Sequence, residues 1–198
     1  MEPIEIGKSY DRIAQKYDAH LTGSEYGLNF LQRAINYCTL TRRALDLGCG
    51  SGGRMIDELE THGFKIWGVD ISAQMLALAR AKHPTIEFQQ ANIVDWQSTQ
   101  SYDLIVAWDS LFHLPLRAQA PVLRKICSWL APQGILMYTF GADQGAHKSS
   151  WHNEPFAYSA IGITENLRII SECHCECKHL ELDQYPEKHV TIIVKKQT

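Results

Sequence analysis

Short apolar runs alternate with amphipathic stretches along most of the chain, and this alternation predicts a mixed α/β fold. The apolar runs expected as strands are residues 44–47, 65–70, 86–88, 104–108 and 134–140. The stretches with helical spacing are residues 8–19, 26–37, 55–62 and 73–82, and a further helix from Pro121 to about Leu130. Strands separated by helices are joined by right-handed crossovers, so the sheet is expected to be mainly parallel.

Single residues mark where several of these helices begin and end. Gly63 is suited to the left-handed cap of one helix, and Ser72 is a typical N-cap for the next. Pro84 ends that second helix. Pro121 fits the first turn of the fifth helix, where its missing N–H costs nothing.

The C-terminal region has a different pattern. Residues 175–182 and 189–195 are two extended runs joined by six residues, too few for a crossover, so an antiparallel hairpin is expected. Residues 142–158 are rich in Gly, Ser and His and show no clear period, which indicates a long and functional loop on the substrate side. The expected fold is a Rossmann-like, doubly wound, mainly parallel seven-stranded sheet with an antiparallel C-terminal hairpin strand and helices on both faces. We expect one domain over residues 1–198, with residues 1–40 as an N-terminal helical lid.

Composition excludes several classes of protein. The chain has 198 residues, 45% of them apolar, and a formal charge of −3 with no basic run. It can therefore bury a core, and a chain without a basic cluster is a poor binder of nucleic acid. Met1–Tyr10 carries no apolar signal core, and no uncharged run is long enough to span a bilayer. Six cysteines in a chain of this size are read as reduced thiols, so a cytoplasmic location is expected.

A glycine motif carries the strongest chemical signal. Residues 48–53 read Gly-Cys-Gly-Ser-Gly-Gly after a predicted strand, and Asp70 ends the next strand. Such a loop lets the backbone approach a ligand, and the acid can accept both ribose hydroxyls of an adenosine cofactor. Asp46 lies at the end of the first strand, where it would repel a pyrophosphate and attract a cationic amino group. This disfavours a nicotinamide-dependent oxidoreductase.

Several motifs in register resemble class I S-adenosylmethionine-dependent methyltransferases. These are residues 45–52 (LDLGCGSG), 69–72 (VDIS), 102–106 (YDLIV), 111–114 (LFHL), 130–136 (LAPQGIL) and the N-terminal 10–18. The resemblance implies S-adenosylmethionine as cofactor and S-adenosylhomocysteine as product. It assigns the cofactor-binding residues Asp46, Gly48, Cys49, Gly50, Tyr17, Asp70, Ile71, Met75, Asn92, Ile93 and Trp108. Asn92 departs from the family, which often has Asp there, but its amide oxygen can still accept from the adenine amine.

The acceptor side is less defined. His113 is the best candidate for a catalytic base or substrate contact, although a histidine that orients its loop is the more common case. Asp109 is more typical of a turn residue than of a catalytic base or ligand. His147 and His152 lie in the expected loop, where they could contact substrate. The Cys/His run at residues 172–179 lacks the spacing of a zinc site. Cys175 and Cys177 are instead expected to face the sheet core, and His174 to take the left-handed position at the end of a helix. No metal is expected.

These observations predict an enzyme, a methyltransferase that acts on a small molecule by in-line displacement, with no nucleic-acid or membrane partner. Two alternatives remain open. One is an S-adenosylmethionine-binding protein without transferase activity, and the other is a methyltransferase for nucleic acid or protein. The residues identify neither the acceptor nor its atom.

Overall fold

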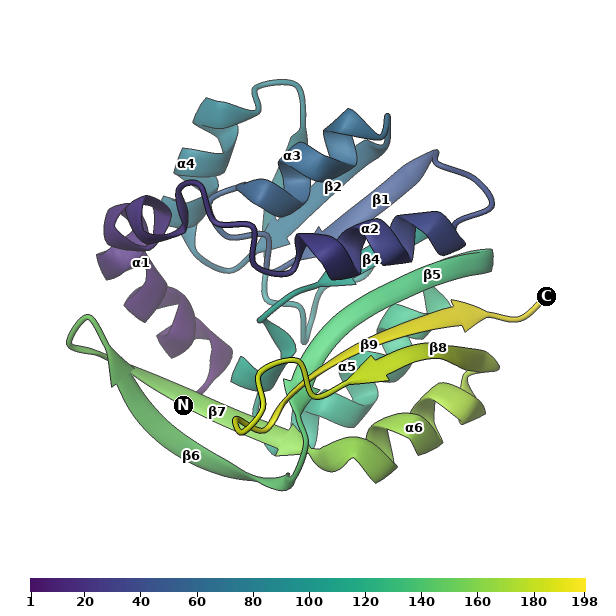
Figure 1. The fold of residues 1–198 in the computed structure, drawn as a ribbon. Coiled ribbons are helices and arrows are strands. Elements are labelled where there is room, and N and C mark those ends of the chain that lie inside the picture. The colour runs from purple at the N-terminus through teal and green to yellow at the C-terminus, as the bar shows by residue number, and fades with distance from the viewer.

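A seven-stranded sheet forms the centre of the computed structural model, which describes residues 1–198 (Figure 1). The strand order is β3-β2-β1-β4-β5-β9-β8. The strands are β1 (Arg43–Leu47), β2 (Lys65–Asp70), β3 (Glu87–Gln90), β4 (Tyr102–Ala107), β5 (Leu130–Gly141), β8 (Cys175–Glu181) and β9 (His189–Lys196). Strand β9 runs antiparallel to β5 and β8, whereas β1 to β5 pair in parallel. The expected sheet and its C-terminal hairpin are confirmed.

Helices cover both faces of this sheet (Figure 1). They are α1 (Pro3–Leu21), α2 (Leu28–Tyr37), α3 (Arg54–Thr61), α4 (Ala73–Lys82), the 3₁₀ turn η1 (Leu111–His113), α5 (Leu116–Ser128) and α6 (Gly162–Glu172). Residues of α2 and α3 pack on one face of the sheet, and residues of α5 and α6 on the other. None of these helices combines the length and the apolar character needed to cross a bilayer.

The segment expected as an irregular loop at residues 142–158 instead forms a β-hairpin. Strands β6 (Gln144–Trp151) and β7 (Glu154–Ile161) pair antiparallel and make a separate two-stranded sheet. Figure 1 shows this hairpin beside α1, and Phe156 of β7 packs on Ile6 and Ile13 of α1. Almost every residue of β6 is exposed, so the strand has no apolar period by which sequence could reveal it.

Two further expectations were wrong. Helix α5 begins at Leu116, so Pro121 lies inside it rather than in its first turn. Burial of Val122, Leu123 and Ile126 against the sheet outweighs the hydrogen bond that the proline cannot donate. Cys175 is buried as expected, but Cys177 is exposed on the edge strand β8, where the pairing becomes irregular.

The capping residues are placed as expected. Ser72 accepts a hydrogen bond from the N–H of Met75 at the start of α4. Gly63 and His174 both have positive φ, at 77° and 55°, directly after α3 and α6. These local signals therefore set where the helices begin and end, and Ser72 does so at the carboxyl edge of the sheet.

Candidate functional site

The loop between β1 and α3 brings bare backbone to the carboxyl edge of the sheet. Gly48 has φ of 74°, a left-handed conformation, and a Cβ added there would lie 2.4 Å from Cβ of Ser110. Its N–H donates to the carbonyl of Val69 at 2.7 Å, which fixes the loop against β2. Glycine is therefore required at position 48 by both conformation and space.

Asp70 closes this loop from the end of β2. Its Oδ2 accepts the N–H of Gly50 and its Oδ1 accepts the N–H of Ser72, each at 2.8 Å. Burial raises the pKa of the Asp70 carboxyl, and these backbone hydrogen bonds partly offset the rise. The carboxylate thus orders the loop and keeps lone pairs that can accept hydrogen bonds from a ligand.

A cavity opens directly beside Gly50 and Asp70. All but two of the residues expected to bind the cofactor line it, together with the candidate base His113: Tyr17, Gly48, Gly50, Asp70, Ile71, Met75, Asn92, Ile93, Trp108 and His113. They come from six parts of the fold, namely α1, the glycine loop, the end of β2, α4, the segment after β3 and the segment after β4. We call this space the central cavity.

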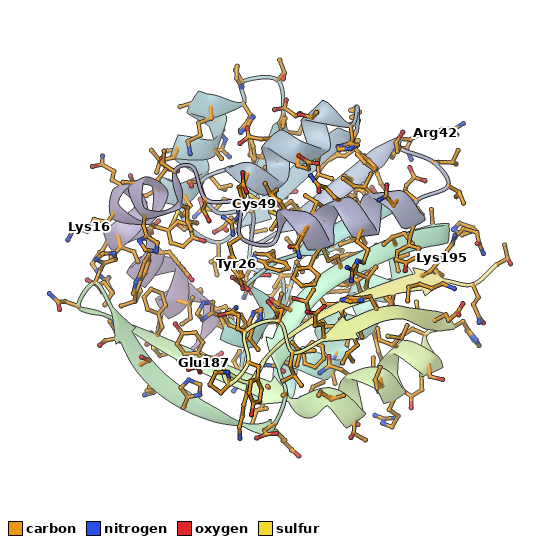
Figure 2. The ribbon with its side chains drawn as sticks, in the orientation of Figure 1. Lys16, Tyr26, Arg42, Cys49, Glu187 and Lys195 are labelled. Carbon is orange, nitrogen blue, oxygen red and sulfur yellow. The ribbon has the colours of Figure 1, made fainter.

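The other two expected residues, Asp46 and Cys49, line an adjoining cleft. Burial raises the pKa of Asp46 to about 7, with Asp70 adding to the rise and Arg54 opposing it. Arg54 lines the same cleft, so a carboxylate and a guanidinium lie close together there. The sulfur of Cys49 points instead toward Gly68 of β2, and its thiol pKa is raised by burial. Figure 2 labels Cys49 near the middle of the molecule.

Asn92 lies in the central cavity, but its amide already has partners. Its Oδ1 accepts the N–H of Val94, and its Nδ2 donates to Asp95, both at 3.0 Å. The amide oxygen keeps a second lone pair, which is the one it could offer to an adenine amine.

Helix α1 covers the central cavity and is held from two sides. Asp11 accepts hydrogen bonds from the hydroxyl of Ser72 at 2.6 Å and from the N–H of Gln74 at 3.0 Å, which fastens α1 to the start of α4. Arg12 donates to Glu154 of the hairpin at 2.7 Å. Tyr10 and Tyr17 of α1 line the cavity, with their rings 5.7 Å apart.

His113 connects α1 with the hairpin. Its Nδ1 lies 2.9 Å from the carbonyl oxygen of Ala157, which can only accept, so Nδ1 carries the ring proton. Its Nε2 then accepts the hydroxyl proton of Tyr10 at 2.9 Å. Burial lowers the pKa of His113 to about 4. A neutral ring with both nitrogens in use favours a positioning role for His113 over that of a base. A catalytic role for His113 stays a prediction.

A second histidine, His189 at the start of β9, lies between two acids. Its Nε2 donates to Oδ1 of Asp109 at 3.0 Å, and its Nδ1 donates to Oδ1 of Asp183 at 2.7 Å. Burial opposes a charge on His189, but the hydrogen bonds to both carboxylates outweigh it, and its pKa is raised. Sequence reasoning did not single out His189 or Asp183, because nothing in their local sequence pairs them with Asp109.

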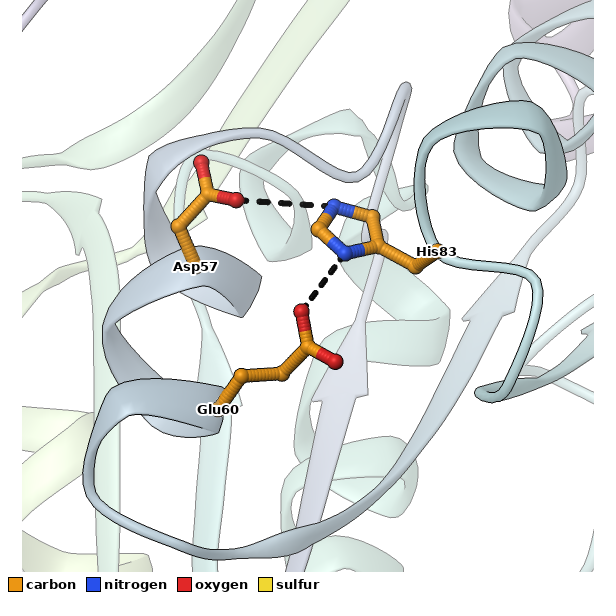
Figure 3. Close-up of side chains that lie close together, drawn as sticks. All are labelled: Asp57, Glu60 and His83. Carbon is orange, nitrogen blue, oxygen red and sulfur yellow. Dashed lines mark hydrogen bonds and ion pairs between the residues drawn. The ribbon is translucent and has the colours of Figure 1, made fainter.

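A group of three metal-ligand side chains lies behind the glycine loop: Asp57, Glu60 and His83. Figure 3 shows the two acids facing different ring nitrogens of His83. Nε2 of His83 lies 2.7 Å from the carbonyl oxygen of Gly52 and must donate to it, and Nδ1 lies 2.7 Å from Glu60. With both nitrogens in use, the cluster fits an ion pair that supports the loop better than it fits a metal site.

The remaining histidine candidates lie on the hairpin. His147 is exposed on β6 and stacks on Tyr158 with ring centroids 5.1 Å apart. His152 is in the turn between β6 and β7, with φ of 49°. Neither lines the central cavity, and contact between these residues and a substrate stays a prediction.

Comparison with known proteins gives consistent matches. The family described as "Methyltransferase domain" matches residues 17–162. A trans-aconitate 2-methyltransferase of Shigella dysenteriae is 32% identical over 145 residues, which cover 66% of this chain and 55% of that protein. A protein of Geobacillus sp. (strain WCH70) that is named as a methyltransferase is 31% identical over 140 residues, covering 66% of this chain and 56% of its own. The chain therefore spans a little more than half the length of these curated relatives.

A solved structure shares the whole fold. An S-adenosylmethionine-dependent methyltransferase of Clostridium acetobutylicum superimposes with a TM-score of 0.74 at 14% identity, over 96% of this chain and 99% of that chain. At this level of identity the likeness concerns the fold alone.

Proposed function

The chain belongs to the methyltransferase-domain family, and we propose that it transfers a methyl group from S-adenosylmethionine to a small-molecule acceptor. Membership confirms the family that the sequence resemblance implied. The names of the relatives and of the matching structure support the enzyme class and the cofactor. The small acceptor is supported by the relatives, since trans-aconitate 2-methyltransferases are named for one. This chain matches only part of those relatives, and the nature of its acceptor is therefore our proposal.

One observation carries the proposal: the expected cofactor residues line a single cavity and the cleft that adjoins it. Asp70 offers acceptors for the ribose hydroxyls, and Ile71 and Ile93 offer apolar surface for adenine. Gly48 lets the loop pack against Ser110, where any Cβ would clash. Asp46 and Arg54 match the ammonium and the carboxylate of a methionyl group.

The bound cofactor would supply the electrophilic methyl group of a sulfonium. The protein's own contribution is to align the acceptor and to exclude water, and such alignment can lower a barrier by about 7–11 kcal/mol. Helix α1 covers the cavity with Tyr10 and Tyr17, and Trp108 closes the other side. These ring faces also favour a cation, by roughly 0.5–2 kcal/mol.

Calorimetric titration tests the cofactor directly. We expect S-adenosylmethionine and S-adenosylhomocysteine to bind with one site per chain and NAD not to bind. Binding of NAD without either of the other two would contradict the proposal. Turnover is then measured with methyl-deuterated S-adenosylmethionine and a panel of metabolites, since a binding protein without transferase activity would show the first result and no labelled product.

A further inference from the structure

Asp109 is a carboxylate of the central cavity with an unused oxygen. Its backbone is left-handed, with φ of 49°, a conformation that is strained for a residue other than glycine and is often kept at functional sites. Its N–H donates to Oγ1 of Thr139 at 2.8 Å, and its Oδ1 accepts from Thr139 at 3.1 Å and from His189 at 3.0 Å. All side-chain bonds fall on Oδ1, so Oδ2 keeps its lone pairs for a ligand.

The groups behind Asp109 hold its charge in place. His189 donates from both ring nitrogens to acceptors, so it is an imidazolium between Asp109 and Asp183. This cation lies 3.0 Å from Oδ1 of Asp109 and fixes the orientation of its carboxylate. The side chain of Asp183 is only 3% exposed and has the imidazolium as its counter-ion.

Polar atoms without partners gather in the same place. The buried side-chain atoms that lack a hydrogen bond are Nε1 of Trp108, Oδ2 of Asp183 and Oγ1 of Thr191. Asp183 is bonded to His189, the Trp108 ring lies 6.2 Å from the His189 ring, and Thr191 lies two residues along β9 on the same strand face. Of these three residues only Trp108 lines the central cavity, and buried polar atoms are rarely left unpaired.

The charges of the cavity determine which class of acceptor can bind there. No lysine or arginine lines the central cavity, and its two acids are Asp70 and Asp109. Asp70 is used by the glycine loop and the expected ribose. Asp109 therefore remains to face an acceptor, among the aromatic rings of Tyr10, Tyr17 and Trp108. A carboxylate acceptor would be repelled here, whereas an amine finds a counter-ion and ring faces.

We infer that the methyl acceptor of this protein is a small amine, and that Asp109 receives its nitrogen while His189 and Asp183 position Asp109. The inference rests on the proposed function. It separates this chain from a methyltransferase whose acceptor is a carboxylate, such as trans-aconitate.

The reaction balances with these groups. The acceptor, bound as an ammonium, first passes one proton to Oδ2 of Asp109, which frees the nitrogen lone pair. This lone pair forms the new N–C bond, the C–S bond breaks, and its electron pair stays on sulfur as the neutral thioether, while the nitrogen keeps the positive charge as the methylated ammonium. Asp109 is thus a catalytic residue in this account, and His189 and Asp183 are positioning residues.

Binding to the protein loaded with S-adenosylhomocysteine tests the inference without turnover. The probes are amines from ethylamine to 2-phenylethylamine, each with the alcohol and the carboxylate of matched length. At least one amine should bind about 10–100-fold more tightly than its matched alcohol and carboxylate, the ratio expected for a hydrogen bond to a charged group. If no amine binds, or if a carboxylate or alcohol binds as well as its matched amine, the inference is overturned.

Isosteric variants assign the effect to Asp109. Asp109→Asn should remove the amine preference and leave the affinity for S-adenosylhomocysteine unchanged, which also shows that the variant is folded. Asp143→Asn is the matched control, because Asp143 is an exposed acid outside the central cavity. Equal losses of amine and S-adenosylhomocysteine binding in Asp109→Asn would assign Asp109 to the cofactor and overturn the inference. Failure of the wild type to bind S-adenosylhomocysteine would instead contradict the proposed function.

The pH dependence of amine binding tests the positioning role. The titratable groups that face Asp109 are His189 and Asp183, Tyr10 and Tyr17 of α1, Tyr26 before α2, His113 of η1 and Tyr158 of β7. Burial raises the pKa of each tyrosine and lowers that of His113 to about 4, so neither kind changes charge between pH 5 and 9. His189→Gln removes the cation and one donor to Oδ1 of Asp109, so the pH profile of amine binding should differ from that of the wild type. An unchanged pH profile would overturn the role of His189.

Discussion

The two sides of the central cavity are built in different ways. On the cofactor side, formed by Gly48, Gly50 and Asp70, residues 2 to 20 positions apart bond through backbone N–H groups. On the acceptor side, formed by Tyr10, Asp109, His113 and His189, side chains meet across 80 to 103 positions. The cofactor side depends on one loop, whereas the acceptor side depends on how α1, the β6–β7 hairpin and β9 assemble.

This difference indicates which changes each side can tolerate. A loop held by its own backbone keeps its shape when distant elements vary, so one cofactor site can serve many acceptors. The acceptor side changes whenever α1 or the hairpin moves, because Tyr10 and Ala157 reach His113 from separate elements. Substitutions on the two sides should therefore affect different measurements.

The largest effect is expected at Asp70. In Asp70→Asn, the amide can accept only one of the N–H groups of Gly50 and Ser72 and turns a donor toward the other. Binding of S-adenosylhomocysteine should weaken by about 100-fold or more, measured by calorimetry. Asp103→Asn is the control, because Asp103 also accepts a backbone N–H, from Arg43, but at the opposite edge of the sheet. Equal effects of both variants would mean that Asp70 has no special role.

His113 should change stability on the acid side. Its folded pKa of about 4 lies below the usual 6.5. At this residue the unfolded chain therefore gains a proton that the native state does not, and the contribution of His113 to stability falls as pH drops from 6.5 toward 4. The loss should reach about 3 kcal/mol, and His113→Gln should be free of it in urea unfolding at several pH values.

The exposed His62 is the control for this measurement, since His62→Gln should keep the wild-type pH profile. If the stability of the wild type and of His113→Gln changes equally between pH 6.5 and 4, the claim that His113 is buried in its neutral form is contradicted.

A smaller effect is expected at Asp46, on the cofactor side. With a pKa of about 7, its carboxyl is partly protonated at neutral pH, and only the ionised form attracts a cationic amino group. S-adenosylhomocysteine should therefore bind more weakly as pH falls from 8 to 6, with release of a proton on binding. Asp46→Asn should lose this pH dependence and bind about tenfold more weakly at pH 8. Asp57→Asn, an exposed acid of the same cleft, should retain the pH dependence.

The smallest effect is expected at His83, which supports the glycine loop from behind. His83→Ala removes the hydrogen bond to the carbonyl of Gly52. Cofactor affinity should fall by about 2–10-fold, the value of one such bond. Added zinc should change neither the affinity nor the melting temperature of the wild type. Stoichiometric zinc in protein purified without added metal would show that the cluster is a metal site and not an ion pair.

The cofactor side could be predicted from the sequence because its chemistry is local. Gly50 and Asp70 are placed by one strand–loop–helix–strand unit, and the N-cap Ser72 follows from residue type alone. The acceptor side could not. The polar strand β6 has no apolar period, so its sequence predicts a loop, and the pairing of Asp109 with His189 depends on the register of β9 against β5.

The structure with bound S-adenosylhomocysteine tests the central claim most directly. We expect the ribose hydroxyls on the carboxylate of Asp70, the adenine beside Ile71 and Ile93, and the sulfur on the side of the cavity that holds Asp109. A ribose bound away from Asp70, or a sulfur directed away from Asp109, would contradict the account.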